Sequence, residues 1–286
     1  MNIAVLLQAS VVMLGTGTPN PDPEHSGPAV AVVVNGAAYL VDAGPGVVRR
    51  AAAAAKRYDL ATLHAERLGP VFLTHLHSDH TAGLPDLIHT GWVAGRERPL
   101  QLYGPPGTRD MAMHLTSAWR EDIEVRTEGD QPHTRDGWKV EAHDIRAGIV
   151  YQDSNVVVRA FAVPHTNWKH AFGYRFETKD RVIVISGDTR PSDAVVEACN
   201  GCDLLVHEVY SAERYATLSA EWQKYHAGSH TSTRELAGLA GRAKPARLVL
   251  YHQLYWGATD DDLLREIRQA GYGGVVVAGR DLERYP

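Results

Sequence analysis

The sequence predicts an α/β (α+β) protein arranged as a four-layer αββα sandwich. Apolar, β-rich runs alternate with helical patterns along the whole chain of 286 residues. A block of consecutive strands lies in the middle of the chain, and it argues against the alternative, a plain doubly wound α/β sheet. No repeat, low-complexity tract or linker composition divides the chain. We therefore predict one domain over residues 1–286.

The first part of the chain mixes strands and helices. Two apolar runs flank Asn35-Gly36, a dipeptide typical of a two-residue hairpin turn. An Ala-rich helix is expected over 47–58. A four-residue apolar spacing predicts another helix over 109–122. The remaining elements expected here are strands at 11–17, 71–77 and 101–105 and a short helix near 84–94.

The middle of the chain is dominated by strands, and helices and strands alternate again after it. Four strand-like runs follow one another, and Lys179-Asp180 joins the last two as a hairpin. A helix near 192–199 starts a regular helix–strand alternation. The expected strands are 139–145, 155–163, 172–178, 181–187, 203–209, 247–252 and 274–279, with further helices at 233–242 and 260–270.

The composition is that of a globular protein, with 44% hydrophobic and 22% charged residues, and it excludes a disordered or fibrous chain. A formal net charge of −5 gives no global basic field that would attract nucleic acid or a membrane. The only two cysteines, Cys199 and Cys202, are expected to be reduced thiols, because a disulfide framework needs more cysteines.

The first ten residues bear on the location of the protein. They are mildly apolar but lack the basic start of a secretory signal. No run in the chain reaches the roughly 18–20 apolar residues of a membrane span. We therefore expect a cytoplasmic protein. An exported form is the alternative if this short leader is a truncated signal.

The segment THLHSDH contains the chemically most informative residues: His75, His77, Asp79 and His80. Side chains alternate along an extended segment, so His75 and His77 project to the same side. A turn after them brings the side chains of Asp79 and His80 to the same end of the strand. Imidazole and carboxylate groups are ligands of cations such as Zn²⁺ or Mn²⁺. Four ligands within six residues exceed the need of one open tetrahedral site, so they predict two metal ions.

Further ligands are expected where strands end in polar turns. His165, Asp188 and His252 each follow such a strand. A carboxylate at one of these positions can bridge two cations. Each residue is weak support by itself, because a strand-end histidine is as often a plain surface residue. Together with THLHSDH, they complete two sets of ligands.

These motifs resemble those of the metallo-β-lactamase-fold hydrolases, within the group that contains ribonuclease Z and the arylsulfatase-like enzymes. The resemblance spans almost the whole chain, and its last motifs separate this group from lactamases and glyoxalases. It rests on LGTGTP (14–19), VDAGPG (41–46), THLHSDHTAGLPDL (74–87), PH (164–165), SGDT (186–189), HEVY (207–210), SHTS (229–232) and LYHQ (250–253).

The resemblance implies two divalent metal ions held by seven side chains, with Zn²⁺ expected and Mn²⁺ or Fe as alternatives. The ligands of the first ion would be His75, His77 and His165. The ligands of the second ion would be Asp79, His80 and His252. Asp188 would bridge the two ions.

The resemblance also implies catalytic roles. Glu208 and His230 would form an acid pair that protonates or stabilises the leaving oxygen. Asp79 would help to orient the nucleophile. The implied catalytic residues are therefore Asp79, Glu208 and His230.

The segment between His165 and Asp188 bears on the substrate. The resemblance implies that a ribonuclease Z of the usual short form carries a long basic arm there, whereas the residues of this chain suffice for only one hairpin. The chain is also acidic overall, while RNA binding relies on clustered Lys and Arg. We therefore expect no exosite arm and no nucleic-acid partner.

Aromatic residues follow several motifs and predict a partly apolar lid suited to small hydrophobic esters. They are Trp92, Trp168, Tyr210, Tyr215, Trp222, Tyr225, Tyr255 and Trp256. The predicted function is hydrolysis of small ester-type substrates (aryl sulfates, phosphodiesters, phosphotriesters or lactones) by a metal-bridging hydroxide. The alternatives are ribonuclease Z-like processing of tRNA 3′ ends and a non-catalytic metal-binding module. We also expect a homodimer without a membrane partner.

Overall fold

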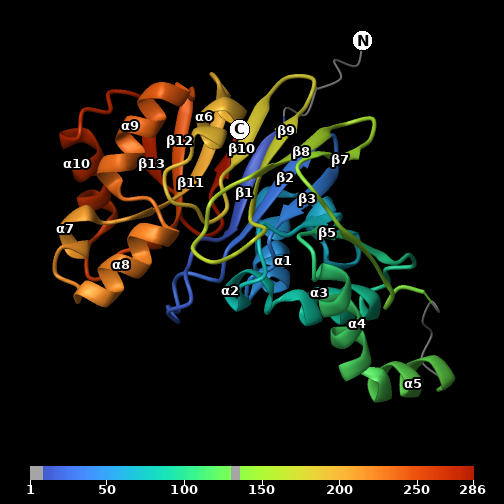
Figure 1. Ribbon diagram of the computed structural model, residues 1–286. Helices are drawn as coiled ribbons and strands as arrows, with labels where there is room; N and C mark the ends of the chain where they lie inside the picture. Colours follow the sequence, from blue (N-terminus) through green and yellow to red (C-terminus); the bar gives the residue numbers. More distant parts are fainter. Residues whose placement is uncertain (1–8, 130–135) are drawn as a thin grey trace, which may run out of the picture. The chain divides into compact units, whose positions relative to one another are not determined.

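The computed structural model describes residues 9–129 and 136–286, which form two compact units (Figure 1). Unit 1 comprises the described parts of Met1–Gly15 and Pro19–Ile145 together with Asp281–Pro286. Unit 2 comprises Thr16–Thr18 and Arg146–Arg280. Each unit contains one mixed sheet of seven strands. The single domain expected over residues 1–286 stays a prediction.

The sheet of unit 1 contains, in spatial order, β14 (Arg284–Tyr285), β1 (Ser10–Gly15), β2 (Ala29–Val34), β3 (Ala37–Val41), β4 (Val71–Phe72), β5 (Leu100–Gly104) and β6 (Val140–Asp144). The strands from β14 to β3 pair antiparallel, and those from β3 to β6 pair parallel. β1 and β2 are buried along their whole length, as expected for continuous apolar runs.

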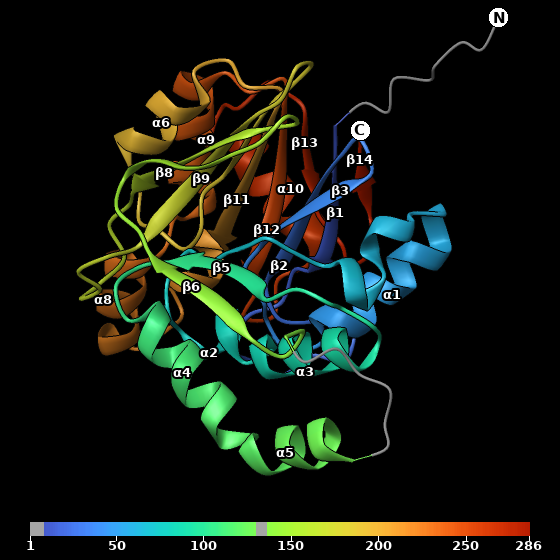
Figure 2. The same cartoon turned by 90° about the vertical axis from the view of Figure 1, so that its right-hand side faces the viewer.

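The helices of unit 1 are α1 (Val47–Tyr58), α2 (Ser78–Thr81), α3 (Leu84–Val93), α4 (Thr108–Ala118) and α5 (Arg120–Glu128), with 3₁₀ turns at Ala61–Leu63 and Ala65–Arg67. α1 buries Val48, Ala51 and Ala55 in the core, because their spacing places them on one helix face. α4 packs on β5 and β6, and α5 continues beyond it (Figure 2).

The last strand of the chain is tied to the first one. Met13 N donates to Glu283 O (2.9 Å), and Tyr58 Oη donates to Leu282 O (2.7 Å). The carboxylate of Asp281 accepts from Ser26 N (2.8 Å). These bonds join segments from opposite parts of the sequence into one unit.

The sheet of unit 2 contains, in spatial order, β13 (Val276–Ala278), β12 (Arg247–Leu254), β11 (Leu204–Tyr210), β10 (Val182–Ile185), β9 (Phe172–Glu177), β8 (Val157–Ala162) and β7 (Gly148–Gln152). The strands from β7 to β10 pair antiparallel, and those from β10 to β13 pair parallel. The inner strand β11 is buried at every residue.

The helices of unit 2 are α6 (Asp193–Cys199), α7 (Ala212–Tyr215), α8 (Ala220–Ser229), α9 (Thr233–Ala243) and α10 (Asp260–Gln269). α9 contacts both α6 and α10, and apolar residues of all three helices pack in one hydrophobic core. α9 begins with a capping box in which Ser232 and Glu235 satisfy each other's backbone N–H groups. This cap fixes the chain directly after His230.

Both predicted hairpins are confirmed. β2 and β3 pair antiparallel around Asn35 and Gly36, whose φ angles of 48° and 78° suit a tight turn. β9 and β10 also pair antiparallel, and they occupy the segment between His165 and Asp188.

Other elements differ from the sequence prediction. The helix expected over 109–122 is two helices, because the backbone leaves the helical region at Trp119 (φ −102°, ψ 19°). The strand expected over 71–77 ends at Phe72, because Thr74 N donates to the Asp42 side chain instead of to a neighbouring strand. β7 and α8 were not expected, and α8 is mostly polar and lacks an apolar stripe.

The prediction of reduced thiols is wrong. Cys199 and Cys202 form a disulfide, with their Cα atoms 4.7 Å apart. The chain reverses between them through left-handed conformations at Asn200 (φ 40°) and Gly201 (φ 82°), which brings the two cysteines within bridging range. A single bridge across one turn needs no wider disulfide framework.

Within residues 9–129 and 136–286, no helix combines the length and hydrophobicity needed to cross a bilayer. The short leader behind the exported alternative falls mainly on residues 1–8, which lie outside the described residues.

Candidate metal centre

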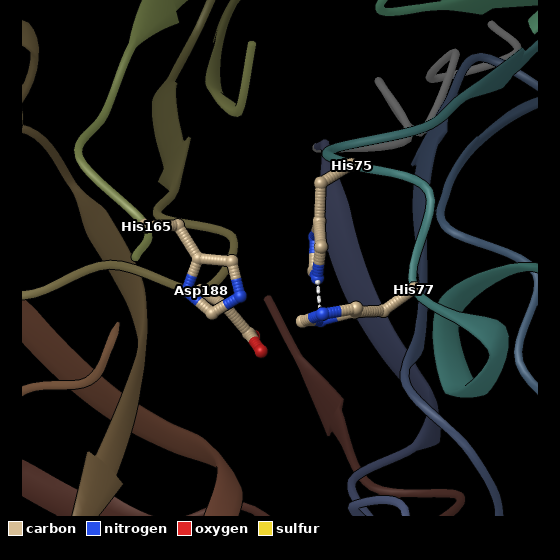
Figure 3. Close-up of side chains that lie close together, drawn as sticks. All are labelled: His75, His77, His165 and Asp188. Atoms are coloured by element: carbon tan, nitrogen blue, oxygen red, sulfur yellow. Dashed lines mark hydrogen bonds between the residues drawn. The ribbon is translucent and has the colours of Figure 1, made fainter. Parts of the chain in front are cut away.

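The THLHSDH segment of unit 1 forms a compact group of ligand atoms. It runs from the loop after β4 into α2, and His75, Asp79 and His80 are buried. His75 Nε2 lies 2.9 Å from His77 Nδ1, as the dashed line in Figure 3 shows. His80 Nε2 lies 3.5 Å from Asp79 Oδ2. The ring centres of His75 and His80 lie 4.2 Å apart, so all four side chains expected from this motif meet within unit 1.

Asp42, at the end of β3, orients this group. Its carboxylate lies 2.8 Å from His80 Nδ1 and accepts from Thr74 N (2.8 Å) and Thr74 Oγ1 (3.0 Å). A carboxylate can only accept, so Nδ1 of His80 donates the proton and Nε2 is the nitrogen presented to a metal ion. Thr74 Oγ1 also lies 3.0 Å from His75 Nδ1. Burial raises the pKa of Asp42, although the nearby His80 ring opposes this rise.

Unit 2 contributes ligand atoms from one strand and from the segments that follow two others. His165 follows β8, Asp188 follows β10 and His252 lies in β12, and all three are buried. Asp188 Oδ2 lies 3.4 Å from His252 Nε2 and 3.9 Å from His230 Nδ1. His165 Nδ1 donates to Ser229 O (2.8 Å), which makes Nε2 its ligand atom. Figure 3 draws His165 and Asp188 on the strand ends that position them.

A local break in the sheet positions His252. Glu208 pairs with Tyr251 and Val209 pairs with Gln253, so His252 has no partner residue in the β11–β12 register. Its φ angle is 46°, in the left-handed region that non-glycine residues rarely adopt. An extra residue in a strand re-aims a side chain, and such strain is typical of functional sites.

Glu208 and His230 form a buried pair in unit 2. Glu208 Oε2 lies 3.5 Å from His230 Nδ1. Glu208 Oε1 accepts from Thr231 N (2.9 Å) and Thr189 N (3.3 Å). Burial, and then the Asp188 carboxylate, raises the pKa of Glu208 well above its usual range. A cation or a protonated imidazole beside this carboxylate would relieve that unfavourable burial.

The donor sets fit divalent metal ions. In unit 2, Asp188, His230 and His252 each offer a ligand atom, and these atoms lie within 4.8 Å of one another. Buried imidazole nitrogens and carboxylate oxygens are the donors that Zn²⁺, Mn²⁺ and Fe share. The bonds at Nδ1 of His80 and His165 orient both rings as in metal sites with an outer shell of partners.

Sequence reasoning missed the residues that orient the ligands. Asp42, Thr74 and Ser229 hold histidine rings through the bonds described above. The signal for Asp42 was present, because VDAGPG was among the matching motifs. The partners of Thr74 and Ser229 become visible only when distant segments are brought together.

The expected aromatic lid is only partly supported. Trp92 is buried in unit 1 at 1% exposure and is a core residue. In unit 2, Tyr210 at the end of β11 contacts Trp256 after β12 (5.5 Å between ring centres) and Tyr215 of α7 (5.1 Å).

Comparison with solved structures identifies the fold class. The metallo-beta-lactamase fold protein YhfI from Bacillus subtilis is similar, with a TM-score of 0.73 and 19% identity, and 97% of this chain and 98% of that chain are covered. The short form of human tRNase Z has a TM-score of 0.69 and 24% identity, with 97% and 98% covered. The protein therefore has the metallo-β-lactamase fold, of the α/β class, as the sequence predicted.

Sequence relatives identify the family. Residues 38–253 match the family described as "Beta-lactamase superfamily domain". Ribonuclease Z of Mycobacterium bovis (strain BCG / Pasteur 1173P2) is 34% identical over 278 residues, which cover 96% of each chain. Ribonuclease Z of Mycobacterium marinum is 34% identical over 281 residues, covering 96% of this chain and 97% of the relative. This chain belongs to the ribonuclease Z family of the beta-lactamase superfamily, which supports a metal-binding hydrolase.

These relatives overturn two expectations. The prediction of a small-ester hydrolase is wrong, and so is the prediction that nucleic acid is not a partner, because the full-length relatives are ribonucleases. The short segment between His165 and Asp188 was a poor criterion for excluding RNA, because a relative named ribonuclease Z aligns with this chain over 96% of both lengths. Net charge was also a poor criterion, since it describes the global field and not the local groups that touch a phosphate.

Proposed function

We propose that this protein is a two-metal endonuclease that cleaves a phosphodiester bond at the 3′ end of precursor tRNA. The observation that carries this proposal is the near end-to-end similarity to proteins named ribonuclease Z, at 34% identity. The buried histidines and aspartates of both units support it, because hydrolysis of an RNA phosphodiester suits a two-metal site. A cytoplasmic location is consistent with such a substrate and is part of the proposal.

We assign the metal ligands as the family resemblance implies. The ligands drawn from unit 1 are His75, His77, Asp79 and His80. The ligands drawn from unit 2 are His165, Asp188 and His252, with the Asp188 carboxylate shared between the two ions. When bound, the ions would lower the pKa of a water molecule and neutralise charge that develops on the phosphate. Zn²⁺ is the first candidate, and Mn²⁺ or Fe the next.

The proposed acid is His230. Its Nδ1 faces the Glu208 carboxylate at 3.5 Å, so Nε2 is the atom that would hold the proton for the leaving oxygen. Glu208 would stabilise the protonated ring, and its own backbone partners, Thr189 and Thr231, fix its position. Asp79 would orient the attacking water. In this scheme the oxygen of the attacking water would bond to phosphorus and lose a proton to solvent. The P–O bond to the leaving oxygen would break, and that oxygen would take the proton from His230.

The direct experiment is cleavage of a precursor tRNA with a 3′ trailer, with the product ends mapped by sequencing. The metal-loaded protein should cut at the trailer boundary, and a chelator should abolish cleavage. Restoring Zn²⁺ or Mn²⁺ should restore it. A matched control is Asp193→Ala, since this carboxylate lies on the exposed surface of α6 and pairs only with Arg242 among the contacts described.

Two results would contradict the proposal. Tight RNA binding without turnover under all metal conditions would favour the non-catalytic metal-binding module. Cleavage that continues unchanged after complete metal removal would exclude the two-metal mechanism.

A further inference from the structure

A series of aromatic rings in unit 2 leads from the surface of α8 to His230. Trp222 and His226 lie one helical turn apart and stack, with ring centres 5.6 Å apart and an angle of 25°. Tyr225 meets Trp222 edge-to-face at 5.8 Å. His226 in turn lies 5.6 Å from His230. We call Trp222, Tyr225 and His226 the α8 ring cluster.

Exposure falls along this series. Trp222 is 57% exposed and Tyr225 38%, whereas His226 is 8% and His230 5% exposed. One face of the Trp222 indole packs on His226, and much of the rest is open to solvent. Large aromatic rings gain free energy by covering such surface, so an open indole next to a candidate acid indicates a binding surface.

The inner part of the α8 ring cluster is held rigidly. His226 lies 4.6 Å from Trp256, whose ring contacts Tyr210. Tyr215 Oη donates to Gln223 O (2.9 Å), which ties α7 to α8, and these helices lie next to each other in Figure 1. His226 is buried between Trp256 and His230 and therefore supports the outer rings by packing.

We propose that Trp222 and Tyr225 form a stacking surface for an unpaired nucleobase that adjoins the scissile phosphate. This inference rests on the proposed function and names the part of the substrate that α8 holds. The choice of a nucleobase follows from the geometry. Tyr225 lies only 6.5 Å from His230, ring centre to ring centre, and His230 is the proposed donor to the leaving oxygen. A flat base attached to that phosphate is the group that reaches the exposed rings.

The contribution of stacking to RNA affinity should depend little on the identity of the base and on the salt concentration. Every base has a π-face, and stacking on an aromatic side chain strengthens binding of single strands without base readout. Phosphate contacts, by contrast, weaken steeply as salt rises. Removing Trp222 should therefore weaken binding by the same factor at low and at high salt, which a lost phosphate contact would not do.

The test uses the metal-loaded protein and a precursor RNA whose scissile phosphate is replaced by a non-hydrolysable phosphonate. 2-Aminopurine is placed on either side of this position, because its emission falls when it stacks. Wild type should quench one of the two probes. Trp222→Ala should remove the quenching and weaken binding by about 5- to 100-fold. Trp222→Phe should restore most of the quenching, and Tyr225→Ala should lower it.

Trp119→Ala is the matched control, because Trp119 is also an exposed tryptophan (40%) but belongs to the α4–α5 break of unit 1. It should change neither quenching nor affinity. Equal quenching by wild type and Trp222→Ala would overturn the stacking surface, as would a loss of affinity that changes with salt. Quenching that depends on Trp222 in a protein that cuts no precursor tRNA would support the surface and overturn only the proposed function. Failure to bind RNA at all would overturn both.

Discussion

The two units use the same sheet plan but present their ligands in opposite ways. Each sheet has an antiparallel half and a parallel half that share one strand, β3 in unit 1 and β10 in unit 2. Unit 1 supplies four candidate ligands from one short segment, His75 to His80. Unit 2 supplies candidates from separate strands or the segments after them, with His165 and His252 far apart in sequence. One unit therefore depends on local chain geometry, and the other depends on its completed sheet.

This difference has a physical origin. In unit 1, one turn after β4 and the first turn of α2 suffice to gather the ligands, and Asp42 fixes their orientation. In unit 2, the parallel strands β10, β11 and β12 bring the ends of distant segments to one edge. We therefore expect substitutions in unit 2 to act on the whole set, and substitutions in unit 1 to act on fewer groups.

The largest expected effect separates the two units at their carboxylates. Asp188→Ala should remove a bond to both proposed ions, so bound metal and activity should fall together. The loss of activity should exceed the roughly 10²–10⁴-fold contribution of a positioned general acid. Asp79→Ala in unit 1 should leave close to one ion bound. Elemental analysis and precursor cleavage measure both variants. Equal metal loss in the two variants would contradict the expected difference between the units.

The second effect concerns proton donation in unit 2. His230→Ala should retain its metal ions and lose about 10²–10⁴-fold in single-turnover cleavage, because no proton reaches the leaving oxygen. A substrate with sulfur in the leaving position needs little protonation, since a thiolate leaves as the anion. The variant should therefore recover most of its rate on that substrate. Equal losses on both substrates would assign His230 to binding and not to acid catalysis.

The third effect tests the orienting residue of unit 1. Asp42→Asn keeps the size of the side chain but weakens its hydrogen bond with His80 Nδ1. Metal affinity should fall by about 10- to 100-fold, as for other outer-shell carboxylates. A competitive titration against a chromogenic chelator measures this. Asp110→Asn, an exposed residue in the first turn of α4, is the control and should bind metal like wild type.

The smallest effect is a pH dependence of stability within unit 2. His207 is fully buried, its Nδ1 donates to Glu208 O (2.7 Å), and its Nε2 has no hydrogen-bond partner among the described residues. Burial lowers the pKa of His207 to about 4 from its ordinary 6.5. Between these values the unfolded chain binds more protons than the folded one, so stability falls as the solution is acidified from pH 6.5 towards 4.

The expected size is about 2 kcal/mol of unfolding free energy between pH 7 and pH 5. Urea unfolding of chelator-treated wild type and His207→Asn measures it, because asparagine can still donate to Glu208 O but cannot gain a proton. The unfolding free energy of the variant should change less with pH than that of wild type. An unchanged slope would mean that His207 does not account for the acid sensitivity.

The comparison of units also explains what the sequence could predict. The unit 1 ligands lie so close together in sequence that residue type and strand ending were enough to find them. Asp188 and His252 were found as strand-end residues, and their grouping needed a known family. The break at His252 could not be predicted, because it depends on the register between β11 and β12. The contact of Asp42 with His80 and the Cys199–Cys202 bridge depend likewise on backbone reversals that composition does not report.

The pairing of β14 with β1 has a consequence for biosynthesis. Tyr285 pairs with Val11, so the outer strand of unit 1 is made long after the strand it covers. At about 5–20 residues per second, the ribosome needs roughly 15–60 s between the two. During that interval the outer edge of β1 offers unpaired backbone groups to other chains, a hazard that edge strands carry. Unit 2 holds all seven of its strands between Gly148 and Ala278, so its sheet can form on the nascent chain before that of unit 1 is closed.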